Sequence, residues 1–177
     1  MTRQRVSVDI LLSITAVITS VCALGITFYQ AYLQRTQQYA SVIPILQTFN
    51  TSGIDDDKTG YAFVVANKGL GPAFIEAVTL DYEGKSYDDI DKLLPQLKDS
   101  TAFANHVTTS TLSKGLVIPQ GESIRLVEIA GGREGSWLRR KIADRMKVTI
   151  VYRSVYKQKW RFTNQSETID DANVELE

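Results

Sequence analysis

The sequence contains few of the residues on which covalent and metal chemistry depend. Its 177 residues include one cysteine, Cys22, and one histidine, His106. A single cysteine excludes an internal disulfide and a zinc site built from cysteines. The histidine lies in a Ser/Thr-rich stretch (100–115), and no acid or nucleophile is spaced to act with it. We therefore predict that the chain is not an enzyme and that it uses no cofactor and no metal.

Complete ligand-binding loops are also missing. The segment "DDDKTG" (55–60) begins with the spacing of a calcium loop, but its twelfth position is Ala66. A calcium loop requires a bidentate glutamate there. We interpret residues 55–60 as an acidic hairpin turn.

A Gly-x-Gly sequence occurs in "VVANKGLGPAFIEAVTL" (64–80). A phosphate-binding loop would run into a helix N-terminus and would carry Lys-Ser/Thr. Here the loop runs into the alternating, β-rich "AFIEAVTL". We predict a structural turn in which Gly69 and Gly71 adopt backbone angles forbidden to other residues. Pro72 keeps Gly71 extended, and Asn67 bonds to the backbone of the turn that it begins.

The sequence has no excess of either charge, since 20 basic and 20 acidic residues cancel. The distribution is uneven, because residues 133–161 carry +8 and residues 162–177 carry −5. Basic residues on a Gly-rich loop, a helix (136–146, with Ser136 as its cap) and a hairpin, interleaved with aromatic residues, suit phosphate or single-stranded nucleic acid. The candidates for binding an anionic ligand are Arg133, Arg139, Arg140, Lys141, Arg145, Lys157, Lys159 and Arg161. The alternative is a solvated basic face that pairs with acidic segments or with anionic lipid headgroups.

One long hydrophobic run is present. Residues 10–34 contain no formal charge, and the strongly apolar part, Ile10–Tyr29, is 20 residues long. This length matches a helix that crosses roughly 30 Å of hydrocarbon. The run exceeds the apolar region of a secretory signal and continues without a break into residues 29–40, which contain no Pro or Gly. We predict a short tail (1–9) and an uncleaved transmembrane helix with a polar extension (10–40), and the flanking charges leave its orientation open.

Small and hydroxyl-bearing residues share one narrow sector of this predicted helix. They are Ser13, Ala16, Ser20, Ala23 and Thr27, spaced three and four residues apart. In lipid, helices associate through small residues and cross-helix hydrogen bonds, and a mean repeat of 3.5 keeps such a stripe facing its partner. We therefore predict a homo-oligomer, in which several copies would line a polar pore. The alternative is that the hydroxyls bond back to carbonyls of their own helix.

From residue 41 onward the pattern becomes β. Runs rich in Val, Ile and aromatic residues alternate with turn-forming stretches. The expected strand regions are 41–49, 61–67, 73–82, 116–130, 147–153 and 157–164, and short helices are expected at 89–99 and 136–146. About seven strands with frequent turns are typical of an immunoglobulin-like sandwich. We predict a mainly-β, Ig-like β-sandwich over 41–165, followed by an acidic flexible tail over 166–177.

Three motifs of this region resemble a known kind of protein. They are Asn67-x-Gly69-x-Gly71-Pro72-Ala73, "IPQGES" (118–123) and "VYRSVYKQKWRF" (151–162). Together they resemble the soluble domain of small bacterial membrane-anchored proteins, in which an N-terminal helix precedes an Ig-like sandwich. The resemblance covers most of 41–163 and implies a single-pass protein of the bacterial inner membrane. The layout is also similar to membrane effectors of anti-phage systems, in which a soluble domain senses a nucleotide or oligonucleotide and the helices disturb the membrane.

These patterns lead to one hypothesis and two alternatives. The leading hypothesis is a membrane effector or sensor whose sandwich binds a ligand and controls the packing of a helix bundle in the bilayer. The first alternative is a passive membrane-tethered adaptor or assembly protein whose sandwich binds another protein. The second is a secreted binding domain with a cleaved signal.

Overall fold

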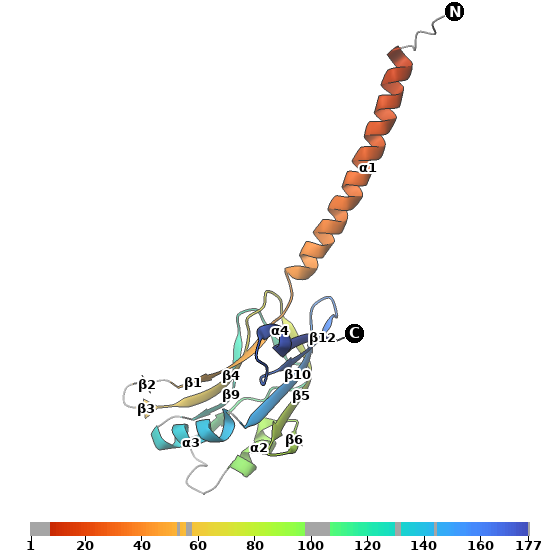
Figure 1. Cartoon of the computed structure of the whole chain (residues 1–177). Coiled ribbons are helices and arrows are strands. Elements are labelled where there is room, and N and C mark those ends of the chain that lie inside the picture. The colour runs from red at the N-terminus through yellow and green to blue at the C-terminus, as the bar shows by residue number, and fades with distance from the viewer. Residues whose placement is uncertain are drawn as a thin grey trace, which may run out of the picture. The chain divides into compact units, whose positions relative to one another are not determined.

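The computed structural model describes residues 8–52, 54–55, 58–97, 107–129, 132–143 and 145–176. The chain divides into two compact units, Met1–Ser41 and Val42–Glu177, and Figure 1 shows the helix of the first and the sheets of the second. His106 and the side chains of residues 53–59 lie outside the described part. The interpretations of that histidine and of the calcium-like turn therefore stay predictions.

Helix α1 (Val8–Ala40) makes up the described part of the first unit. Its 33 residues span about 50 Å at 1.5 Å per residue. It is long and apolar enough to cross a membrane, and none of its residues is buried. Exposed apolar side chains such as Ile10, Ile18 and Phe28 suit a helix whose surroundings are lipid rather than protein. An apolar N-terminal helix of the predicted length is thus present.

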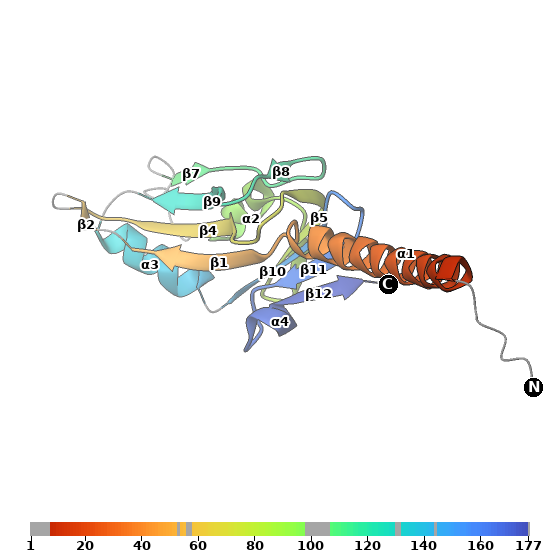
Figure 2. The same cartoon turned by 90° about the horizontal axis from the view of Figure 1, so that it is seen from above.

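The second unit, the head, contains two main antiparallel sheets. The first has the order β1 (Leu46–Thr51), β4 (Tyr61–Asn67), β9 (Ser123–Ile129), β7 (Val107–Thr109). The second has the order β12 (Asn173–Leu176), β11 (Lys159–Thr163), β10 (Met146–Arg153), β5 (Ala73–Tyr82), β6 (Lys85–Tyr87), and β8 (Val117–Ile118) also pairs with β5. A separate pair is formed by β2 (Ile54–Asp55) and β3 (Lys58–Thr59). Figure 2 shows the strands of the two sheets from above. The prediction of a mainly-β domain with two sheets and short helices is confirmed.

A single apolar core joins the two sheets. On β10 every second side chain, from Met146 through Val148 and Ile150 to Tyr152, is fully buried, because successive side chains of a strand point to opposite faces. These residues belong to the same cluster as Leu46 and other residues of the first sheet. Each large apolar side chain buried in this way contributes about 1.5–3 kcal/mol. The head therefore has the core of an independent domain.

The described part of the head also contains three short helices. They are α2 (Ile90–Leu97), α3 (Gly132–Ile142) and α4 (Ile169–Ala172). The helix predicted for 136–146 begins four residues earlier and ends four residues earlier, so Ser136 lies inside α3 and is not its cap. Leu138 and Ile142 of α3 are fully buried in the core. This anchoring fixes which face of α3 reaches the surface.

The acidic C-terminal segment corrects an expectation. Residues 166–177 were predicted as a flexible tail, but they include α4 and strand β12, which pairs with β11. The Thr168 hydroxyl caps α4 by accepting a hydrogen bond from Asp171 N at 3.1 Å. Asn173 is buried and bonds to Leu46, 127 residues away in the sequence. The acidic composition concealed this strand because its main anchor is a long-range contact.

Candidate functional site

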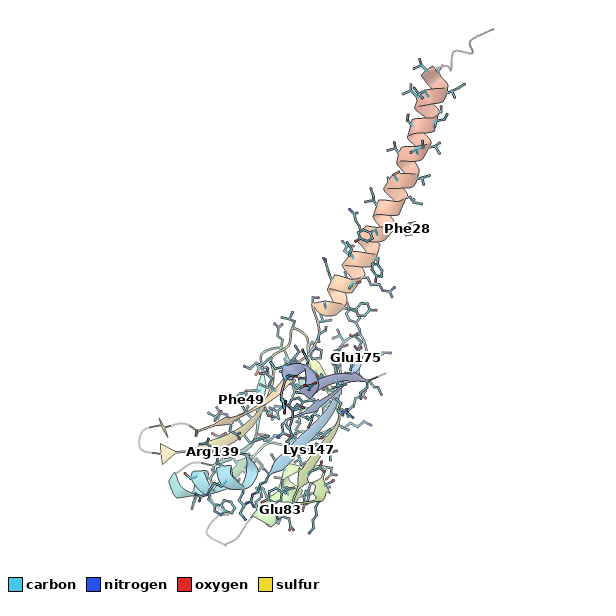
Figure 3. The ribbon with its side chains drawn as sticks, viewed as in Figure 1. Phe28, Phe49, Glu83, Arg139, Lys147 and Glu175 are labelled. Carbon is cyan, nitrogen blue, oxygen red and sulfur yellow. The ribbon has the colours of Figure 1, made fainter. Side chains whose placement is uncertain are left out.

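The structure separates the predicted anion-binding residues into two groups. Arg145 precedes the start of β10, whereas Lys159 pairs with Arg153 at the other end of that strand. Eight residues of strand hold these ends about 25 Å apart. Figure 3 shows the same separation, since Arg139 on α3 and Glu175 on β12, beside the hairpin, lie at opposite ends of the head. A small ligand bound at one group would not reach the other, and binding of an anion by these residues stays a prediction. The side chain of Arg133 lies outside the described residues.

In the hairpin group, Lys159 shares the carboxylate of Glu76 on the neighbouring strand β5 with Arg153. Lys159 Nζ lies 3.2 Å from one carboxylate oxygen of Glu76, and Arg153 Nε lies 3.6 Å from the other. The Arg153 guanidinium also lies over the Phe74 ring, at 4.7 Å from its centroid. Lys157 is part of the tight turn and has a positive φ of 66°, and Arg161 is exposed on β11. This arrangement matches the alternative of a solvated basic face better than a ligand site.

In the α3 group, two cations have partners and two do not. Lys141 lies 5.7 Å from the centroid of the Trp137 ring, and Arg145 Nη1 lies 3.5 Å from a carboxylate oxygen of Glu83. Arg139 and Arg140 are exposed, and among the described residues no carboxylate pairs with them. The structure therefore leaves these two guanidinium groups available at the surface.

Arg139 and Arg140 open onto a cavity of about 380 Å³. We call it the α3 pocket, and it is lined by Asn50, Ser136, Arg139, Arg140 and Ala143. Arg139, Arg140 and Ala143 follow Ser136 by three, four and seven positions. This spacing places the four residues on one face of a helical turn. The opposite face carries the buried Leu138 and Ile142. Packing of α3 on the core thus aims a Ser-Arg-Arg face at the end of β1.

Asn50 of β1 completes the α3 pocket. The Tyr61 hydroxyl donates a hydrogen bond to its Oδ1 at 2.6 Å. This bond assigns the amide orientation and leaves the Nδ2 donors at the other end of the amide group. Sequence reasoning missed Asn50 because 86 residues separate it from Ser136. The helical spacing of Ser136, Arg139 and Arg140 was the signal that could have identified the rest.

A second feature is the connecting segment (Val42–Leu46), which follows α1 after Ser41. The sequence predicted a strand over 41–49, but β1 begins at Leu46. The preceding residues accept hydrogen bonds from the glycine turn, with Lys68 N to Ile45 O at 2.8 Å and Leu70 N to Ile43 O at 2.9 Å. The connecting segment is therefore bonded into the head.

Two glycines allow the glycine turn to lie close to the backbone of the connecting segment. Gly69 and Gly71 are not among the described residues with positive φ, so the predicted reason for them is wrong. A Cβ on Gly71 would lie 2.6 Å from the carbonyl carbon of Val42, and one on Gly69 would lie 2.7 Å from that of Pro44. Both glycines are needed for space. The turn itself is structural, because it binds the protein's own backbone.

Buried polar side chains hold the connecting segment from two sides. Asn67 is fully buried, and its Oδ1 accepts from Gly69 N at 3.0 Å and Ile45 N at 3.3 Å. Its Nδ2 donates to Gly71 O at 2.7 Å and Ile118 O at 2.9 Å. The predicted bond from Asn67 to its own turn is thus confirmed, and every polar atom of this side chain has a partner.

The second support comes from the C-terminal half of the head. The Tyr152 hydroxyl shares its one proton between two acceptors, Asn173 Oδ1 at 2.7 Å and Pro44 O at 3.2 Å. Asn173 also bonds to both the N–H and the C=O of Leu46, at 3.1 and 3.0 Å. Burial raises the pKa of the Tyr152 hydroxyl above its ordinary value. Sequence reasoning missed both side chains because their partner is distant in the chain.

The predicted packing stripe, Ser13, Ala16, Ser20, Ala23 and Thr27, is exposed on α1. Two of its hydroxyls bond to carbonyls of their own helix: Ser13 Oγ donates to Asp9 O and Thr27 Oγ1 donates to Ala23 O, both at 2.8 Å. Thr15 and Thr19 bond back in the same way. At Ser13 and Thr27 the hydroxyls therefore follow the alternative given above, in which they bond to carbonyls of their own helix. Its middle, at Ala16, Ser20 and Ala23, offers small side chains.

These features define a class of protein: an apolar N-terminal helix followed directly by a mainly-β head with an arginine-lined pocket. A family model described as "Domain of unknown function (DUF8453)" matches residues 8–173, so the chain belongs to this family. The match includes both α1 and the head up to Asn173. No curated protein matches the chain.

Proposed function

We propose that the chain is a non-enzymatic single-pass membrane sensor or effector whose head binds a ligand and thereby controls how its membrane helices pack. The head would be an immunoglobulin-like sandwich, and the membrane would be the bacterial inner membrane. The observation that carries this proposal is the connecting segment, which begins one residue after Ser41 of the helical unit and is hydrogen-bonded into the head. A rearrangement of the head at Val42–Leu46 would act on the chain directly beside the helix.

Self-association would occur through the stripe on α1. Ala16, Ser20 and Ala23 allow close approach of two helix backbones, which is what association in lipid requires. The hydroxyls of Ser13 and Thr27 already bond to their own helix, so side-chain packing rather than cross-helix hydrogen bonding would dominate. A ligand can shift this equilibrium only if the head binds it with different affinity in the two packing states.

The specific form of this proposal is an antiviral effector. A nucleotide or oligonucleotide signal would bind the head, and the helix bundle would open a pore in the membrane. The resemblance to anti-phage membrane effectors supports this form. Arg139 and Arg140, which pair with no carboxylate in the described part of the chain, also support it, since guanidinium groups bind phosphate.

Cysteine cross-linking tests self-association, because Cys22 is the chain's one cysteine. On a Cys22→Ser background, Ser20→Cys places a thiol on the stripe. Ile18→Cys places one on the opposite side of the helix, because two positions at 100° per residue amount to about 200°. After mild oxidation of native membranes, we expect a disulfide-linked dimer from Ser20→Cys and monomer from Ile18→Cys. Monomer from both variants would contradict the proposal and leave the passive, tethered adaptor.

Topology and conductance test the remaining steps. A reporter that is active on one side of the membrane only, fused to the C-terminus, would locate the head. A cytoplasmic head is required for a cytoplasmic nucleotide signal, so a periplasmic result would eliminate that form. Conductance of liposomes that contain the full chain, with and without anionic ligands, tests the pore. An inserted oligomer that stays silent would again favour the adaptor.

A further inference from the structure

We propose that the α3 pocket binds a phosphate group carried on a larger molecule. The inference names the ligand class that the proposed function requires, and in this respect it rests on that function. Its starting point is a contrast in charge pairing. Arg145, Arg153 and Lys159 each lie within 4 Å of a carboxylate, whereas Arg139 and Arg140 pair with none of the described residues.

The chemistry of the pocket lining selects an anion. Its two arginines contribute two positive charges, and none of the lining residues that the structure describes is acidic. A guanidinium presents five N–H donors and no acceptor. The Asn50 amide adds donors, because its oxygen is already engaged by the Tyr61 hydroxyl. A cationic ligand would be repelled by the two arginines, whereas an anion with several oxygens satisfies both the charges and the donors.

The charge of the lining favours a phosphate group over a single carboxylate. Two neighbouring guanidinium groups offer two sets of parallel N–H donors, and paired oxygens of phosphate accept such bonds in bidentate fashion. A phosphate monoester or diphosphate carries close to two negative charges, which match the two arginines. At about 380 Å³, the pocket is of the size that holds small organic ligands. The space beyond the phosphate would therefore hold the group that carries it.

Calorimetric titration of the full chain with inorganic pyrophosphate tests this site. The chain is kept in neutral detergent in a buffer free of phosphate and sulfate. We expect saturable binding by the natural sequence. Arg139→Gln combined with Arg140→Gln removes both charges and should weaken binding by at least about tenfold, because hydrogen bonds to charged groups contribute about 1.5–3 kcal/mol. Binding that survives this double variant unchanged would place the anion elsewhere and overturn the proposal.

Two further variants separate the pocket from general charge. Asn50→Asp keeps an oxygen for the Tyr61 hydroxyl but replaces the amide donors by a negative charge, so binding should also fall by about tenfold or more. Lys85→Gln combined with Lys147→Gln removes two exposed charges elsewhere on the head and should change affinity less than about twofold. Equal losses in the pocket and control variants would show a diffuse effect of net charge and would overturn the site.

The source of the phosphate, soluble molecule or lipid headgroup, is resolved by comparing two kinds of nanodisc. One contains phosphatidylcholine and the other contains phosphatidylcholine with phosphatidic acid. Pyrophosphate binding in both supports a soluble ligand, and binding in the first only supports a lipid headgroup. No binding in either would refute the site. Cross-linking through Ser20→Cys is recorded in the same samples: a dimer without phosphate binding overturns this inference alone, and binding without a dimer overturns the proposed function alone.

Discussion

Two regions of the head use asparagine side chains to join distant segments, and they differ in how completely the polar groups are satisfied. Asn67 is fully buried and makes four hydrogen bonds to the backbone around the connecting segment. Asn50 is exposed at the α3 pocket, and its oxygen accepts one bond, from Tyr61. In the first network, every polar atom of the side chain is hydrogen-bonded to the protein's own backbone. In the second, the amide belongs to an exposed residue that lines the α3 pocket.

This difference distinguishes a structural site from a binding site. Buried polar groups must be paired, because an unpaired one costs about 1–3 kcal/mol. Exposed donors pay no such penalty while water bonds to them, so they can be kept for a ligand. We therefore expect substitutions in the connecting network to reduce stability and substitutions in the α3 pocket to reduce binding only.

The largest effect is expected for Asn67→Ala. The substitution leaves the N–H groups of Gly69 and Ile45 and the carbonyls of Gly71 and Ile118 without their partner. We expect a loss of about 4 kcal/mol in the free energy of unfolding of the head, measured by urea denaturation of the full chain in detergent.

The matched substitution Asn50→Ala removes a single, part-buried hydrogen bond, from the Tyr61 hydroxyl, and should cost only about 1 kcal/mol. Similar losses at the two asparagines would break the comparison, because they would mean that exposure does not separate structural from binding residues.

The next largest effect is expected for Gly71→Ala. The added Cβ would collide with the backbone of Val42, and backbone atoms cannot rotate away as a side chain can. We expect a loss of about 3 kcal/mol in the stability of the head, again from denaturation curves. Gly25→Ala on α1 is the control, because its Cβ would meet nothing within 4 Å. A well-tolerated Gly71→Ala would show that the connecting segment is not tightly seated.

The glycine turn also shows how far the sequence could predict this molecule. Local patterns identified the apolar helix, most strands and the Asn67 bond, because periodicity and turn chemistry act over a few residues. The reason for Gly71 was wrong, since the segment that it must clear lies 29 residues earlier. Strand β12 and the role of Asn50 were missed on the same grounds. Contacts between distant segments leave no local pattern.

A smaller effect is expected for Tyr152→Phe. The variant loses the hydrogen bonds to Asn173 and Pro44 but keeps the packing of the ring, so it should cost about 1.5 kcal/mol at neutral pH. Burial raises the pKa of this hydroxyl in the folded head. As pH rises through about 10, the unfolded chain therefore loses its proton first. The unfolded state then binds fewer protons, and stability falls by up to about 1.4 kcal/mol per pH unit.

The phenylalanine variant lacks this contribution from Tyr152. The difference in stability between the natural chain and Tyr152→Phe should therefore shrink between about pH 9 and pH 11. A difference that stays constant over this range would contradict a buried, hydrogen-bonded hydroxyl.

The smallest effect on stability is expected in the α3 pocket. Arg139→Gln combined with Arg140→Gln removes no ion pair with a described residue and leaves the buried Leu138 and Ile142 in place, so the ligand-free head should change by less than about 0.5 kcal/mol. Removal of two like charges acts in the stabilising direction and offsets part of any loss. With saturating pyrophosphate the natural chain should become more stable than the double variant, because a ligand that binds only the folded state stabilises it, and more so the tighter it binds. The melting temperature of the natural chain should then rise while that of the double variant stays the same. If the double variant were instead destabilised without ligand, the two arginines would have a structural role like that of Asn67. The contrast between the Asn67 network and the α3 pocket would then disappear.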